Sequence, residues 1–232
     1  MAASAVLRRQ LTRDACVLAA SPLVRLALVQ ATHATEAGRQ QWGLTNAHAS
    51  RLFGRAVVAT ALLAAPLEGE ERVTMQFTAP HINGVDAPVS SLRAEASAHG
   101  ELRASIAGAA VPAAADVLLA NRPVIQAGRI ISALELAPLP ALASWSGRFS
   151  RDSVLTVSRI LYNRTEAATS SVSIGSDEGG RSTGDVESDV AHLFEVSDQV
   201  ASAIRLDVCT DAATSAADAG RLVYSGGVVG QV

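Results

Sequence analysis

Two stretches of the chain place chemically capable side chains at meaningful spacings. The loop from Gly175 to Ser182, GSDEGGRS, has the P-loop spacing of glycine, four residues, glycine, a basic residue and serine. Such a loop can cradle phosphate with its backbone N–H groups. Further on, Asp189, His192 and Glu195 are spaced three residues apart, so one helix face could hold them for acid–base or metal chemistry.

The residues of the loop itself argue against a nucleotide site. Arg181 replaces the lysine that normally contacts phosphate, and Asp177 and Glu178 lie inside the loop. Further carboxylates follow at positions 185, 187 and 189, where they would satisfy the start of the next helix and repel an anion. We therefore predict that this loop is a surface connection and binds no nucleotide.

The histidines and serines give no second site. A solvated helix face is the commoner origin of the Asp189, His192 and Glu195 pattern, because no other ligand cluster accompanies it. No serine lies in a Gly-x-Ser-x-Gly elbow, the chain has no lysine, and the remaining histidines are isolated: His33, His48, His81 and His99. The sequence predicts no catalytic, cofactor-binding or metal-binding residue and no enzymatic activity.

Cys16 and Cys209 are far apart in sequence, and neither belongs to a Cys-x-x-Cys pair, which predicts no zinc site in this chain. Cys209 lies in the alternating run SAIRLDVCT, where we expect a buried thiol that behaves as a small hydrophobic residue. This cysteine usage favours a reducing or neutral compartment.

The composition indicates a folded, soluble protein. Of the 232 residues, 49% are hydrophobic and 18% charged, enough apolar surface for one large domain or two small ones. The 19 basic residues are all arginine, are dispersed, and leave a net charge of −3, which argues against nucleic-acid binding. No apolar run reaches the ~18 residues of a membrane span, so no membrane partner is expected.

The first residues, MAASAVLRRQLTR, carry three arginines and no acid before Asp14. This composition is typical of an organelle presequence and equally of an ordinary frayed terminus. We therefore expect a flexible leader over residues 1–14. The location is then cytoplasmic, or an organelle matrix such as the mitochondrion if the segment is a presequence.

The middle of the chain predicts a buried helix between strands. Residues from Ser21 to Thr35 are interpreted as a strand, followed by a short helical turn that ends at Gly43. Thr45 and Asn46 are N-cap candidates for a helix near residues 45–65, which we expect to lie between layers because its second half is apolar on all sides.

The rest of the chain predicts strands, one connector and one further helix. Residues 71–79 alternate, with Val73, Met75 and Phe77 on one face, and turn signals beyond them suggest an antiparallel meander. Alanine and proline make residues 107–150 an irregular connector. Strand patterns then resume around the helix candidate DVESDVAHLFEVSDQ. The fold class predicted is α+β, mainly an antiparallel sheet packed against helices.

These pieces, in order, resemble the N-terminal domain of the 33-kilodalton heat-shock protein family, the redox-regulated holdase chaperones. The resemblance covers about residues 15–232 and is carried by fold-bearing stretches: LVRLALVQAT, ASRLFGRAVVATALLAAPLEGEERVTMQF, GELRASI, DSVLTVSR, HLFEVSDQVASAIRLDV and YSGGVVGQV. It implies one domain over residues 15–232, with helices on an antiparallel sheet and dimerisation by exchange of elements. Residues 175–185 then look like an enlarged loop inserted between a strand and a helix.

The chain departs from the family pattern in two places. Ala201 follows SDQV where the family usually has proline. Family members continue past GGVVGQV into a small domain whose Cys-x-Cys and Cys-x-x-Cys pairs hold zinc, and none of those cysteines occurs in these residues.

The resemblance implies an ATP-independent holdase that binds unfolding client proteins through exposed apolar surface and acts as a homodimer. The chain itself would carry no cofactor, since the family's zinc belongs to the switch domain. The alternative is a structural subunit of a larger complex that reuses the same domain. The sequence does not identify the client-binding residues.

Overall fold

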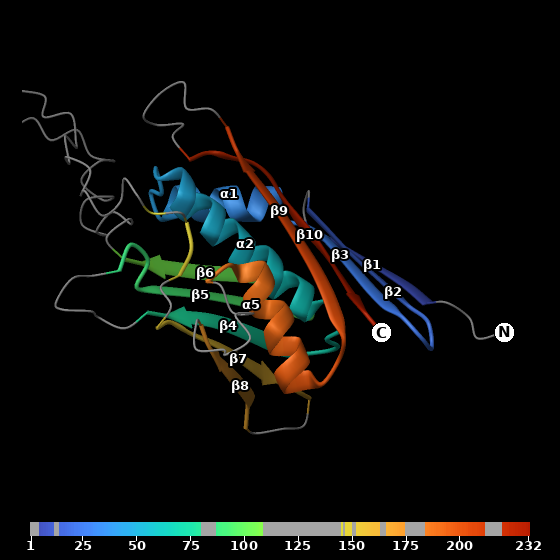
Figure 1. Cartoon of the computed structure of the whole chain (residues 1–232). Helices are drawn as coiled ribbons and strands as arrows, with labels where there is room; N and C mark the ends of the chain where they lie inside the picture. The colour runs from blue at the N-terminus through green and yellow to red at the C-terminus, as the bar shows by residue number, and fades with distance from the viewer. Residues whose placement is uncertain are drawn as a thin grey trace, which may run out of the picture.

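The computed structural model describes residues 5–11, 14–79, 87–108, 145, 147–149, 152–162, 166–174, 184–211 and 220–232. Ten strands form two antiparallel five-stranded sheets, with helices packed against them (Figure 1). This confirms the α+β prediction. The predicted meander is confirmed as well, because three consecutive strands pair in the order β6-β5-β4.

The first sheet has the strand order β1-β2-β3-β10-β9. Its strands are β1 (Ala5–Leu11), β2 (Asp14–Ala20), β3 (Arg25–Gln30), β9 (Ser202–Thr210) and β10 (Leu222–Gln231). β1 lies within the predicted leader and pairs with β2 along its whole length. The division of the chain into a flexible leader of residues 1–14 and a domain of residues 15–232 stays a prediction.

The second sheet has the strand order β6-β5-β4-β7-β8. Its strands are β4 (Arg72–Thr78), β5 (Ser91–Ser97), β6 (Leu102–Ala107), β7 (Val154–Ile160) and β8 (Ala168–Ser173). Val73, Met75 and Phe77 of β4 point inward and are fully buried, as their alternation predicted. Most of the predicted connector lies outside the described residues, but Phe149 packs into the core.

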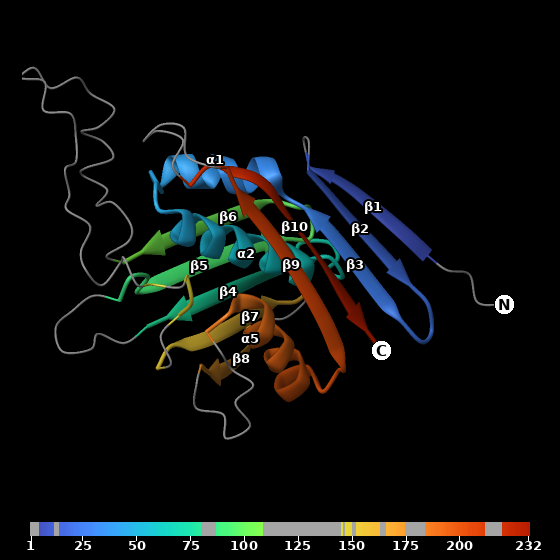
Figure 2. The same cartoon turned by 45° about the horizontal axis from the view of Figure 1, so that its top comes forward.

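Helix α2 (Ala47–Ala64) is the predicted buried helix, and it lies between the two sheets (Figures 1 and 2). Asn46 caps it: its side chain accepts hydrogen bonds from the backbone N–H groups of His48 and Ala49. Small residues allow close packing. A Cβ on Gly54 would lie 2.8 Å from Val208, and one on Gly227 would lie 2.9 Å from Val58. The position of α2 between layers is therefore confirmed.

Helix α1 (Thr32–Gln41) corrects the prediction of a strand that continues to Thr35. β3 ends at Gln30, and the helix begins two residues later, without a side-chain cap of its own. Its cap comes from β2, since the carboxylate of Asp14 accepts hydrogen bonds from the N–H groups of His33 and Ala34. The capping residue thus lies 19 positions upstream of His33. Local sequence patterns around the helix therefore do not reveal where it begins.

Helix α5 (Val186–Leu193) continues into a π-helical turn, η1 (Phe194–Asp198). This confirms the helix predicted after the glycine-rich loop. Trp42, which follows α1, donates from Nε1 to the carbonyl of Ala104 on β6, so an indole covers that edge of the second sheet.

Candidate functional site

The three residues considered for acid–base or metal chemistry do not form a site. Asp189 of α5 is fully buried, which corrects the expectation of a solvated helix face, whereas Glu195 in the following turn η1 is exposed. Asp189 points inward because it lies on the same side of α5 as the buried residues Val186, Val190 and Leu193. Within the described ranges, no group of three His, Cys, Asp or Glu side chains could hold a metal ion.

The other histidines have separate partners. His33 contacts Asp14 at 3.1 Å, His48 packs against Trp145, and His99 contacts Glu70 at 3.4 Å. His81 and the P-loop-like residues 175–182 lie outside the described residues.

The carboxylates that follow the glycine-rich loop are bound to other parts of the fold. Arg55 of α2 donates to Asp185 at 2.6 Å, and Glu187 accepts the backbone N–H of Leu206 at 2.8 Å. The expected capping by these carboxylates is not seen, since the side chain of Asp185 makes no cap hydrogen bond, but their negative charges still lie at the start of α5 and disfavour an anion there.

The two cysteines are both free thiols, but only Cys16 is buried. The expectation of a buried Cys209 was wrong. Leu206 and Val208 turn toward the core, so strand alternation puts Cys209 on the outer side with Asp207. Partial burial and the neighbouring carboxylate of Asp207 raise the pKa of the Cys209 thiol, which disfavours the reactive thiolate.

The outer face of the first sheet gathers exposed aliphatic side chains. The strand register aligns Val17, Leu28 and Val228 in one row across β2, β3 and β10, and Ala19 and Leu26 lie side by side in the neighbouring row. We call these five residues the aliphatic face. Their strand neighbours Ala27, Val29 and Val229 point the opposite way and are buried against α2.

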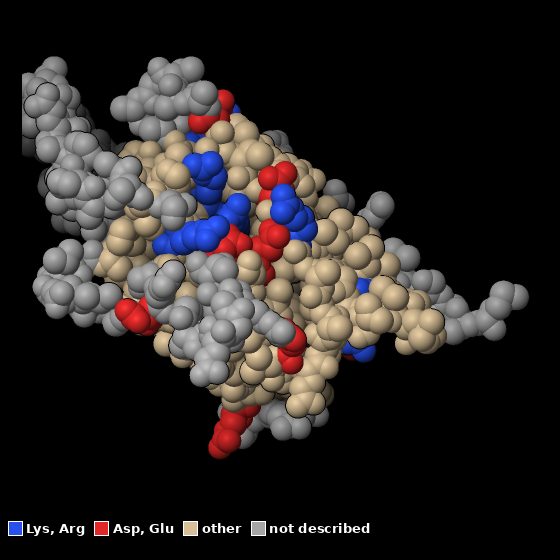
Figure 3. Space-filling view, viewed as in Figure 1, with Lys and Arg blue, Asp and Glu red and all other residues tan. Residues whose placement is uncertain are grey.

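The aliphatic face is open and nearly free of charge. Leu26 is 38% exposed and Leu28 is 46% exposed, and the adjoining turn exposes Leu23 and Val24. Among the side chains that the structure describes, those with charge beside this face include Arg205 of β9, which pairs in register with Val228, and Asp207, which lines the same depression. Figure 3 shows few charges at the lower right, where β2 and β3 join. The face contains a depression of about 410 Å³.

Glycine and tyrosine shape the β10 side of this depression. A register shift between Leu222 and Tyr224 puts Tyr224 on the outer side, where its ring covers Gly226. A Cβ at position 226 would collide with the tyrosine hydroxyl. The glycines of the YSGGVVGQV stretch therefore keep the face flat and allow Tyr224 to lie against it.

The outer face of the second sheet is mainly polar by contrast, although Val154 and Ile160 are exposed at the two ends of β7. Thr156 and Ser171 share a hydrogen bond of 3.0 Å between hydroxyls, as do Ser158 and Thr169. The outer face of the first sheet is therefore suited to apolar partners, whereas water solvates the outer face of the second sheet well.

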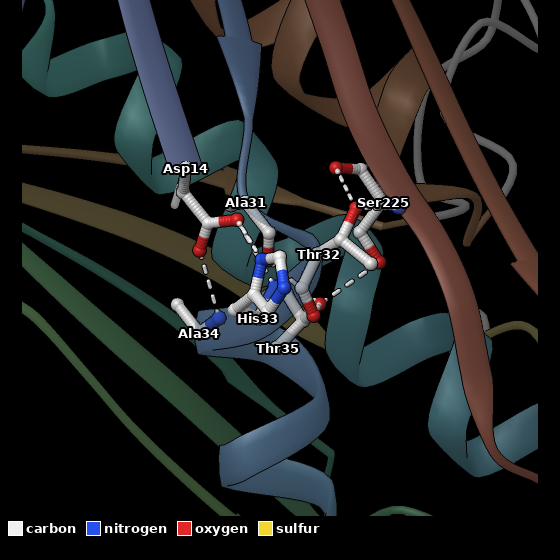
Figure 4. Close-up of polar contacts among 7 residues, drawn as sticks. All are labelled: Asp14, Ala31, Thr32, His33, Ala34, Thr35 and Ser225. Carbon is white, nitrogen blue, oxygen red and sulfur yellow. Dashed lines mark hydrogen bonds and ion pairs between the residues drawn. The ribbon is translucent and has the colours of Figure 1, made fainter. Parts of the chain in front are cut away.

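A buried polar cluster holds the strands of the aliphatic face in place (Figure 4). The buried hydroxyl of Ser225 on β10 accepts a hydrogen bond from Thr35 at 2.9 Å, and Thr32 accepts the N–H of Ser225 at 3.1 Å. Together with the Asp14 cap, these bonds join β2, β10 and the start of α1. Sequence reasoning did not anticipate this cluster, because it joins Thr32 to Ser225, 193 residues further along the chain.

A second depression, of about 260 Å³, lies between the end of α2 and the first sheet. Its lining includes Arg159, which binds Asp198 through two hydrogen bonds of 2.9 and 2.7 Å. Burial opposes ionisation of Asp198, but the hydrogen bonds and charge of Arg159, with the Ser197 hydroxyl, outweigh it. The pKa of Asp198 therefore lies below its ordinary value of 3.8.

This lowered pKa predicts a pH-dependent contribution to stability. The ion pair contributes fully above the unfolded-state pKa of about 3.8, and the contribution is lost as the pH falls through the lower folded-state value. Because the pair is partly exposed, we expect D198N to cost at most about 1 kcal/mol at pH 6. Urea unfolding at pH 6 and pH 2.5 checks this. A wild-type advantage over D198N that is equally large at both pH values would contradict it.

Comparison with known proteins places the chain in a family. The model described as Hsp33 protein matches residues 15–225. No curated protein matches the chain. Among solved structures, the chain is similar to the 33 kDa chaperonin (heat shock protein 33 homolog) of Thermotoga maritima, at 22% sequence identity and a TM-score of 0.58. The match covers 90% of this chain and 57% of the Thermotoga chain, so the 232 residues span less than two thirds of that relative.

The family match covers nearly all of the described fold, from β2 into β10, and the structural match independently supports the architecture. No helix in the described part is long and apolar enough to cross a membrane. The predicted resemblance is confirmed: the chain belongs to the Hsp33 family of stress-response chaperones, which are not enzymes.

Proposed function

We propose that this protein is an ATP-independent holdase that captures unfolding polypeptides on the aliphatic face. The observation that carries the proposal is the asymmetry between the two sheets: Leu26 and Leu28 are exposed on one outer face, and hydroxyl groups line the other. Family membership supports a chaperone role. The face itself would be the client-binding site that sequence reasoning left unidentified.

Binding would draw its free energy from apolar area removed from water. Fully burying a leucine side chain is worth about 1.5–3 kcal/mol, and the exposed leucines can supply part of that each time a client covers them. The aliphatic face offers few directional polar groups, so it would select clients by apolar content and not by sequence. Such low selectivity suits a protein that meets many unfolded chains.

Redox control in the family acts through zinc-binding cysteines. These 232 residues contain only Cys16 and Cys209, in no Cys-x-x-Cys arrangement, and the raised pKa of Cys209 disfavours its thiolate. We therefore expect these residues to bind clients equally well with and without reductant.

Light scattering of a heat-denatured client, with the protein in excess and with or without dithiothreitol, tests the proposal. We expect suppressed aggregation that reductant does not change. Client aggregation identical to a protein-free sample would reject the holdase function. Suppression only after oxidation would reject the redox-independent part alone.

A fixed structural subunit is the second candidate, because one permanent partner could cover the same aliphatic face. Size exclusion of a native extract separates the two: a single stoichiometric large complex favours the subunit. The same column, run on the pure protein, tests the proposed homodimer.

A further inference from the structure

The two open sheets have four edge strands, and side-chain hydrogen bonds reach the backbone of two of them, β6 and β9. Unpaired N–H and C=O groups on an edge strand are a template for pairing with another chain, and folded proteins usually block them. Trp42 donates to the carbonyl of Ala104 on β6, and Glu187 accepts the N–H of Leu206 on β9. The sequence of the third edge strand, β1, is AVLRRQL and contains two arginines, and charged residues are common on edge strands.

β8 is the fourth edge and differs from the others. Its sequence, ATSSVS, has no charged residue and no proline. It pairs with β7 on one side, and it lies at the lower end of the molecule in both Figures 1 and 2, away from the first sheet. By its sequence β8 is an unprotected edge, and its contact with η1 is made by side chains, the Ser197 hydroxyl donating to that of Ser170.

The register identifies which backbone groups of β8 face away from β7. Ile174 donates its N–H to the carbonyl of Ser153, so this pair is hydrogen-bonded, and every second pair along an antiparallel ladder shares that pattern. Residues 168, 170 and 172 therefore point their backbone groups at β7. Thr169 and Ser171 point theirs outward, and within the described part of the chain no hydrogen bond reaches these backbone groups.

We propose that β8 binds an extended segment of an unfolded client as an added antiparallel or parallel strand. This inference rests on the proposed holdase function and adds a second contact on the other sheet. Backbone pairing is independent of client sequence, and the uncharged hydroxyl side chains of Thr169 and Ser171 repel no client charge. The aliphatic face would select for apolar content, while the β8 edge would select for extended backbone.

An unfolded segment fits this edge better than a second copy of the chain. A six-residue strand is roughly 20 Å long, and pairing along it covers far less than the ~800 Å² per partner of a stable dimer. Such a small contact is adequate as one of several weak contacts with a flexible chain.

The test compares S171P with S171A, using reduced carboxymethylated α-lactalbumin as a permanently unfolded client. Proline removes the outward N–H of Ser171 and leaves the β7 pairing groups intact, since edge strands tolerate proline. Alanine removes only the hydroxyl. We expect S171P to bind the client roughly fivefold more weakly than S171A, with S171A close to wild type.

Hydrogen exchange of the wild type gives a second readout that does not depend on how the variant folds. We expect the amides of Thr169 and Ser171 to become at least about tenfold better protected when client is added. Equal affinity of S171P and S171A, or unchanged exchange at both amides, would overturn the proposal. A sedimentation difference between the two variants without client would assign the edge to a second copy, and would overturn it too.

The outcomes also separate this inference from the proposed function. If wild type fails to bind the client at all, the holdase function fails. If wild type binds, and only substitutions on the aliphatic face weaken binding, the β8 inference fails alone.

Discussion

Replacing Leu26 and Leu28 together with threonine should weaken client capture roughly tenfold, measured as the protein concentration that halves aggregation of a heat-denatured client. Each leucine is already partly in contact with its neighbours, so we count about half of the lower burial value of about 1.5 kcal/mol for each. Two such losses come to about 1.5 kcal/mol, close to the ~1.4 kcal/mol of a tenfold change. Threonine keeps the strand propensity of β3 and a hydroxyl that water solvates. Stability should change little, because both side chains point away from α2.

The second sheet supplies a matched control for this variant. Val154 is 37% exposed and Ile160 is 49% exposed, close to the values of Leu26 and Leu28, but both lie on the polar outer face. The double variant V154T/I160T should retain wild-type capture. Equal losses in the two double variants would show that exposed apolar area anywhere on the molecule suffices, and the aliphatic face would lose its assigned role.

Truncation of Phe77 to alanine should lower the free energy of unfolding by about 3–5 kcal/mol. Phe77 is fully buried and stacks on Phe149, with ring centroids 4.1 Å apart and an interplanar angle of 6°. Removing the ring therefore loses buried area and leaves a cavity against its neighbour.

Urea unfolding followed by circular dichroism measures this loss. T78A is the neighbouring control, since Thr78 is exposed on the other face of β4 and should change stability by less than about 0.5 kcal/mol. A loss below about 1 kcal/mol in F77A would mean that Phe149 and its surroundings collapse into the space, and that this part of the core is loosely packed.

Periodic patterns made much of the fold predictable from sequence. The apolar run after Asn46 gave the buried helix and its cap, because an N-cap and its helix are adjacent in sequence. The alternation of Val73, Met75 and Phe77 gave β4 and its buried side for the same local reason. The order of the strands in two separate sheets was not predictable, since it depends on pairing between distant segments.

The errors have identifiable physical causes. The helical turn predicted before Gly43 is the second half of α1, and its start was placed too late because the cap is Asp14, which only the folded sheet brings to Thr32 and its neighbours. Cys209 was assigned to the core although alternation with Leu206 and Val208 indicated the opposite side, so this signal was present and was overlooked. The aliphatic face could not be predicted, because exposure of Leu28 depends on which side of the sheet α2 covers.

Helix α2 lies in the interior between the two sheets and contacts strands of both. If either sheet detached, the same buried segment of α2, from Ala56 to Ala64, would be exposed to water. The two layers thus lose their support together, and the domain should melt in one cooperative step without passing through a half-folded form. For a stress-response chaperone this coupling means that a partly unfolded form, which would itself need capture, is not populated as the temperature rises.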